Sequence, residues 1–194
     1  MKIKQLFSLA LAGSLMLACH STREVTRVEE SAQIDLSGRW NDTDSRLVAQ
    51  DMVSDALSHP WLSNWTEKTG KRPVVIVGLV QNRSSEHIAM ETFINDIERA
   101  FINSGQVRVV QGQEFRDDLR AEKADQQNNA SRETIKRFGM ELGADFIMQG
   151  EVSSITDSNG RTKLIFYQTS LELTNIETNE KVWIGDKKIK KVIE

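Results

Sequence analysis

The residue types on which redox proteins and many enzymes depend are scarce in this sequence. The chain has a single cysteine, three histidines and two prolines. One cysteine cannot form an internal disulfide, so redox chemistry within the chain is excluded. The sequence also contains neither a P-loop nor a glycine-rich dinucleotide-binding motif. We therefore expect no cofactor, no metal and no small-molecule substrate.

An excess of basic residues is missing as well. The formal net charge is −3, with 25 basic and 28 acidic residues. Without Lys2 and Lys4, which precede an apolar N-terminal run, 23 basic residues would face 28 acidic ones, giving a net charge of −5. This balance argues against a nucleic-acid partner. The shares of hydrophobic (39%) and charged (27%) residues are those of an ordinary globular domain.

The N-terminus has the pattern of a bacterial export signal. Lys2 and Lys4 are followed by twelve residues, Leu6 to Leu17, that form an apolar run too short to span a bilayer. The run ends in Met16-Leu17-Ala18-Cys19, which resembles a lipobox with Cys19 as the lipidated residue. We predict a signal peptide over residues 1–18 and a lipidated, flexible tether over 19–37. A plain secreted protein is the alternative.

A helical region is expected next, at the start of a single globular domain over residues 38–194. Asp42 or Thr43 is expected to cap a helix that ends near Pro60, and a second helix then places Trp61 and Trp65 on one side. Two tryptophans at this spacing favour a core role, and a ligand-stacking role is the alternative.

The run Val74–Val80 predicts a buried central strand, because it is apolar without alternation and too short for a helix. Ser84 or Ser85 is expected to cap the following helix, which Gly105 ends. A short strand over 107–110 and two further helices follow. The last quarter alternates as three strands, with turns at Asp157–Gly160 and Glu177–Asn179. The predicted fold class is α/β: a mixed central sheet flanked by helices, ending in a three-stranded antiparallel meander.

Three polar segments have a functional and a structural interpretation. Ser84 and His87 suggest a hydrolase, but neighbours at the start of one helix point in different directions, so capping is favoured. The run Asn41–Asp44 suggests calcium, but it lacks the glycine and the final glutamate of an EF-hand loop. The four lysines of Lys187–Lys191 suggest an anionic partner, although lysines also protect an edge strand from aggregation.

Several of these segments together resemble the LpoB-type penicillin-binding protein activators, which are bacterial outer-membrane lipoproteins. The resemblance runs from Gly38 nearly to the C-terminus and is carried by Gly38–Arg46, Val75–Gly78, Asn82–His87, Asp125–Gln127, Gly143–Phe146 and Val182–Gly185. It implies a fold like the N-terminal domain of TolB and no catalysis. The chain departs from the family in one respect, since its tether is short and has no proline.

The resemblance also implies a function, a partner and a location. It predicts a non-enzymatic regulator that binds and activates a bifunctional, class A penicillin-binding protein in peptidoglycan synthesis. The protein would be anchored to the outer membrane by its lipid and would face the periplasm. The expected contact residues are Arg39, Trp40, Asn82, Arg83 and His87, because arginine and tryptophan often anchor interfaces. The alternative is a subunit of an outer-membrane secretion complex related to curli-secretion lipoproteins.

Overall fold

The computed structural model describes residues 26–29, 32–113, 116–118, 121 and 132–194. The predicted signal peptide and the lipidation site at Cys19 lie outside these residues, as do residues 125–127 of the family resemblance and much of the first helix expected after the strand over 107–110. The chain divides into two units, Met1–Ala32 and Gln33–Glu194, and the description below concerns the second. Among the described residues, none of the helices combines the length and the hydropathy that a membrane-spanning helix requires.

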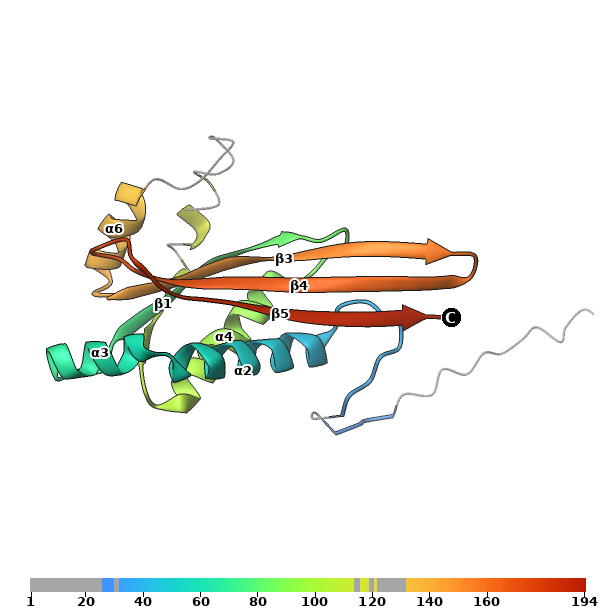
Figure 1. Ribbon diagram of the computed structural model, residues 1–194, viewed down its shortest axis with the longest axis horizontal. Helices are drawn as coiled ribbons and strands as arrows, with labels where there is room; N and C mark the ends of the chain where they lie inside the picture. The colour runs from blue at the N-terminus through green and yellow to red at the C-terminus, as the bar shows by residue number, and fades with distance from the viewer. Residues whose placement is uncertain (1–25, 30–31, 114–115, 119–120, 122–131) are drawn as a thin grey trace, which may run out of the picture. The chain divides into compact units, whose positions relative to one another are not determined.

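A five-stranded sheet in the order β2-β1-β3-β4-β5 organises this unit (Figure 1). β1 (Val74–Arg83) pairs in parallel with β2 (Arg108–Val110) and with β3 (Phe146–Asn159). β3, β4 (Thr162–Asn175) and β5 (Lys181–Ile193) pair antiparallel in sequence order. The mixed sheet and its closing meander are therefore as predicted, and the apolar run of β1 is an internal strand with neighbours on both edges.

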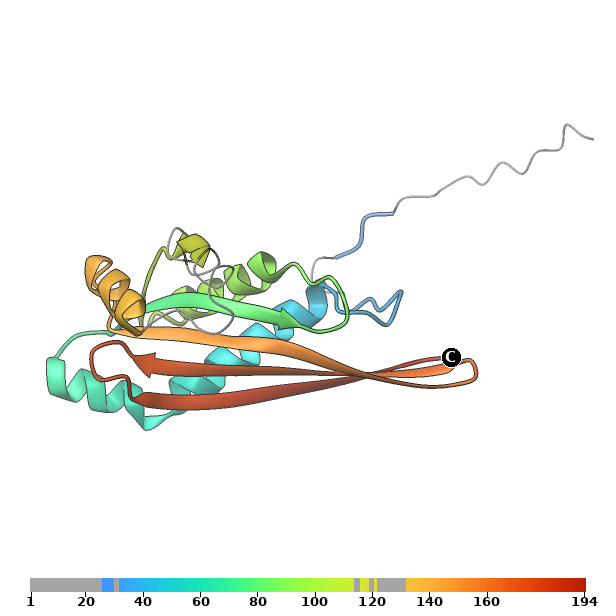
Figure 2. The same ribbon diagram turned by 90° about the horizontal axis from the view of Figure 1, so that it is seen from above.

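Helices cover both faces of the sheet, but not to the same extent. Figures 1 and 2 show α2 (Asp42–Ser58), α3 (Pro60–Thr69) and α4 (Met90–Ser104) on one face and α6 (Arg132–Glu141) on the other. The run Val75-Ile76-Val77 contributes to the hydrophobic cores on both faces of the sheet. Val75 and Val77 belong to the larger core, and Ile76 belongs to a smaller one. This explains why the strand is apolar without alternation.

Three local predictions differ from the structure. The N-cap of α2 is Asn41 rather than Asp42 or Thr43, because Asn41 and Asp44 exchange side-chain to backbone hydrogen bonds in a capping box. Ser84 and Ser85 do not cap α4, which begins at Met90 after Ala89 without a side-chain cap. The first hairpin turn lies at Gly160-Arg161, since β3 continues through Asn159, which pairs with Thr162.

Polar contacts attach α2 to the edge strand β5 along its length. Lys191 contacts Asp44, Lys187 contacts Asp51, and the Trp183 indole donates to Asp55. The three acidic residues lie seven and four positions apart on the helix, and their partners lie four apart on the strand. These intervals keep each set on one face of its element. The helix therefore runs antiparallel to β5.

Candidate partner-binding surface

The two segments predicted to contact a partner lie together, at the end of the sheet where β1 ends. The Trp40 backbone N–H donates to the Glu86 carboxylate (3.3 Å) and to the Tyr167 hydroxyl (3.1 Å). Tyr167 in turn donates to Glu86 (2.8 Å). A residue of β4 thus joins the segment before α2 to the loop after β1. The sequence suggested each segment separately but gave no indication that Tyr167 connects them.

Trp40 occupies the inner side of this surface. It is half-buried, and its ring meets Phe93 and Tyr167 edge-on at centroid distances of 5.9 and 5.6 Å. Its indole N–H donates to the Ser45 hydroxyl at 2.9 Å. These contacts make Trp40 a cover over the core and fix the position of its exposed neighbour Arg39.

The loop after β1 is held by the side chain of Asn82. Its carbonyl oxygen accepts from the backbone N–H and the hydroxyl of Ser84, and its amide donates to the Glu86 carbonyl at 2.7 Å. The Ser84 hydroxyl also donates to the Glu86 carbonyl (3.2 Å), so its described bonds go to the loop and not to His87. These bonds also explain why the serines do not cap α4: Ser84 stabilises the turn that precedes the helix.

Three of the predicted contact residues, two arginines and one histidine, have side chains that are accessible to solvent. Arg39 and His87 are exposed. Arg83 is the last residue of β1, and its side chain is 61% exposed while its Nε lies 2.7 Å from a Glu151 carboxylate oxygen. An exposed pair of this kind contributes little to stability, so Arg83 can exchange this partner for another at low cost.

Lys191 is an enclosed charge of this region, and sequence reasoning missed its role. Its side chain and that of Asp44 are each 9% exposed, and Nζ lies 2.6 Å from an Asp44 carboxylate oxygen. Nζ also bonds Asp35 and donates to the Arg39 carbonyl at 3.0 Å. Lys191 therefore fastens the segment before α2 to β5. The available signal was the inward alternation of Lys187, Ile189 and Lys191 opposite the acidic face of α2.

The ionisation of this cluster follows from its contacts. Burial by itself lowers the pKa of Lys191, but the hydrogen bonds that Lys191 donates to Asp35 and Asp44 outweigh it, so the pKa lies above the ordinary 10.5. The hydrogen bond from Lys191 lowers the pKa of Asp35 below 3.8. A raised lysine pKa adds stability that is lost as the pH rises through it, and a lowered aspartate pKa adds stability that is lost as the pH falls through it. Lys191 and Asp35 are therefore both charged near neutral pH.

Tyr167 offers a direct test of this geometry, because it is the one tyrosine of the chain. Burial, and then its hydrogen bond to Glu86, raises the pKa of the Tyr167 phenol well above the ordinary 10.0. We expect almost no phenolate absorbance at 295 nm at pH 10.5 in the folded protein, and about three quarters of the full phenolate signal at the same pH in 6 M guanidinium, where the tyrosine has its ordinary pKa. A folded protein that titrates with a midpoint near 10 would contradict the buried Tyr167–Glu86 bond.

The two tryptophans of α3 belong to the structure of the domain. Trp61 is buried, and its indole donates to the Ala56 carbonyl. Both Trp61 and the half-buried Trp65 lie edge-on to Phe146 with centroids 5.0 Å apart. The core role predicted for the pair is confirmed.

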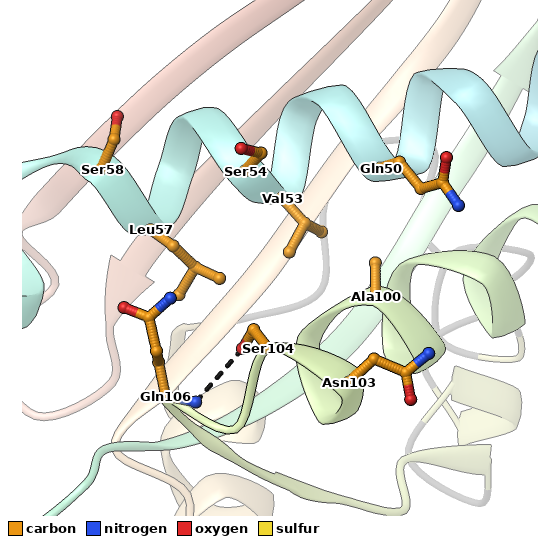
Figure 3. A pocket seen from close by; sticks show the side chains of 9 residues that line it. All are labelled: Gln50, Val53, Ser54, Leu57, Ser58, Ala100, Asn103, Ser104 and Gln106. Carbon is orange, nitrogen blue, oxygen red and sulfur yellow. Dashed lines mark hydrogen bonds between the residues drawn. The ribbon is translucent and has the colours of Figure 1, made fainter.

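A separate hollow of about 540 Å³ lies between α2 and α4 (Figure 3). It contains no predicted contact residue, and all of its lining side chains are uncharged: Gln50, Val53, Ser54, Leu57, Ser58, Ala100, Asn103, Ser104 and Gln106. The charged surface around Arg39 and Arg83 is therefore a distinct feature of the molecule.

The chain matches one family model and several solved structures. A family model described as "Peptidoglycan-synthase activator LpoB" matches residues 44–189. The LpoB C-terminal domain from Salmonella enterica is 18% identical, with a TM-score of 0.50 over 75% of this chain and 98% of that one. The corresponding Escherichia coli domain is 20% identical, with a TM-score of 0.48 over 78% and 98%. Lipoprotein GNA1162 from Neisseria meningitidis is 14% identical, with a TM-score of 0.46 over 62% and 83%. No curated protein sequence matches.

Proposed function

Because the chain belongs to the LpoB family of peptidoglycan-synthase activators, we propose that it binds a bifunctional, class A penicillin-binding protein and raises its activity. The observation that carries this proposal is the family match, which extends from α2 to β5. A regulator of this kind needs a stable contact surface and no catalytic group of its own. The charged end of the sheet around Arg39 and Arg83 would supply such a surface.

Of the predicted contact residues, some would contact the synthase directly and others would position them. Arg39, Arg83 and His87 are exposed and would contact the synthase directly. Trp40 and Asn82 would position them, since Trp40 is packed on the core and Asn82 holds the loop. Activation is limited by the difference in affinity for the active and inactive states of the synthase. A tenfold shift in that equilibrium requires a difference of about 1.4 kcal/mol.

The N-terminal sequence supports an attachment to the outer membrane. A lipidated Cys19 would leave the 18 residues His20–Ser37 as a tether of at most about 60 Å when fully extended. The domain would then face the periplasm, where the synthases act. Mass spectrometry of the membrane-extracted protein tests the lipidation of Cys19. The wild-type chain should carry the mass of the lipid, and the Cys19→Ser variant should not.

Binding to the synthase tests the proposal. We expect the full-length chain to bind one of the bifunctional synthases of its own organism, and Arg83→Ala to weaken that binding about fivefold to tenfold, as for a contact worth about 1 kcal/mol. Lys71→Ala is the matched control, since Lys71 is an exposed cation before the other end of β1. Titration of fluorescently labelled protein measures both. The proposal fails if the wild-type protein binds none of these synthases.

A further inference from the structure

The face of the sheet opposite α2 and α4 carries apolar side chains near the β3–β4 turn. Ile155 of β3 pairs with Phe166 of β4, which pairs with Lys190 of β5, and Leu164 pairs with Val192. Ile155 is 67% exposed and Val192 is 60% exposed. We call these five residues, Ile155, Leu164, Phe166, Lys190 and Val192, the open-face patch.

The alternation of the strands places this patch outside the core. Ile165 and Tyr167 are fully buried toward the helices, so Phe166 between them points to the opposite face. Figures 1 and 2 both show the β3–β4 turn and the end of β5 extending beyond the helices. Apolar side chains gathered on an exposed sheet face are characteristic of an interaction surface.

The charges of β5 identify Lys190 as part of this surface. Lys187, Lys188 and Lys191 each pair with a carboxylate, from Asp51, Asp186 and Asp44 respectively. Lys190 instead lies over the Phe166 ring at 5.9 Å from its centroid, and no carboxylate pairs with it among the described residues. A lysine that lies above an aromatic ring and pairs with no carboxylate of the described residues can bind a partner that brings a carboxylate to an apolar contact.

One residue of the surface described above, Arg83, lies on the same face as the open-face patch. Arg83 pairs with Ser153, which lies two residues before Ile155 on the same side of β3. The Arg83–Glu151 pair lies on this face too, because Glu151 precedes Ser153 by two residues. The sheet face therefore runs without interruption from Arg83 to the patch.

From this arrangement, we infer that the open-face patch is the docking surface for the synthase, which would meet it with an apolar area bearing a carboxylate opposite Lys190. This inference rests on the proposed function and specifies the surface that performs it. The apolar centre supplies the contact area, and Lys190 and Arg83 at its borders orient the partner.

Binding of the full-length chain to its cognate synthase tests the inference. The double variant Ile155→Ser with Phe166→Ser should weaken binding at least tenfold. Ile102→Ser is the matched control and should bind within twofold of wild type, because Ile102 is 59% exposed on α4, on the other face. Lys190→Glu is a second, independent variant. It should also weaken binding at least tenfold, whereas Lys71→Glu should not.

The outcomes separate this inference from the function it rests on. Wild-type binding that neither the double variant nor Lys190→Glu reduces would overturn the patch and leave the function intact. A wild-type dimer in sedimentation that the double variant dissociates, with synthase binding unchanged, would assign the patch to a second copy and also overturn the inference. Absence of wild-type binding would overturn both. Circular dichroism and thermal unfolding identify any variant that is misfolded.

Discussion

Replacement of Lys191 by methionine is expected to lower the free energy of unfolding by about 3 kcal/mol. The side chains of Lys191 and Asp44 are each 9% exposed, so the substitution leaves an enclosed carboxylate without its partner. The Arg39 carbonyl also loses its donor, which loosens the segment before α2. A loss of this size should lower Tm by about 6 to 12 °C in a domain of this length. Urea denaturation followed by circular dichroism measures it.

The neighbouring residue supplies the control for this prediction. Lys190→Met removes the same charge one position away, where the side chain is exposed and contacts Phe166. It should cost less than about 1 kcal/mol. The effect of Lys191→Met should also decrease in acid, because Asp35 has a lowered pKa and loses its contribution as the pH falls below 3.8. Equal destabilisation by the two substitutions would contradict the structural role of Lys191.

Substitution of Gly150 by alanine is expected to destabilise the domain by about 3 kcal/mol, through overpacking between two strands. A Cβ atom at Gly150 would lie 2.0 Å from the Ser170 carbonyl oxygen and 2.9 Å from the Leu171 Cα atom. Both belong to the backbone of β4, which cannot move aside as a flexible side chain can. The long β3–β4 pairing would have to open locally. Chemical denaturation measures the loss.

Gln149→Ala tests whether this effect is specific to Gly150. Gln149 is the preceding residue of β3 and already has a Cβ atom, so its truncation should cost less than about 1 kcal/mol. If Gly150→Ala were as stable as Gln149→Ala, β3 and β4 would not approach as closely as described.

Much of the fold was predictable because local patterns were unambiguous. The unbroken apolar run of β1 indicated a strand covered on both faces, and the alternation of the last quarter indicated the strands of the meander. The spacing of Trp61 and Trp65 after Pro60 correctly indicated the helix α3. These signals depend on residues close in sequence, for which backbone preferences and periodicity are sufficient.

The remaining features depend on contacts between distant residues. Asn41, Asp42 and Thr43 are all residue types that can cap α2. Asn41 is the N-cap because Asp44, three residues later, completes a capping box with it. Ser84 is a good helix cap by composition, but Asn82 holds it in a turn. The lysines of β5 appeared to be equivalent until the strand register placed Lys187 and Lys191 against α2 and Lys190 over Phe166. Such pairings become visible only once the strand is placed.

The most direct test of the proposed function is an assay of lipid II polymerisation and cross-linking by the bifunctional synthases of the same organism, with and without the purified full-length chain. We predict that the chain stimulates one of these synthases and that the Ile155→Ser, Phe166→Ser variant does so at least tenfold less effectively at equal concentration. The absence of stimulation of every synthase, at concentrations that saturate any binding, would contradict the proposal that this protein activates a peptidoglycan synthase.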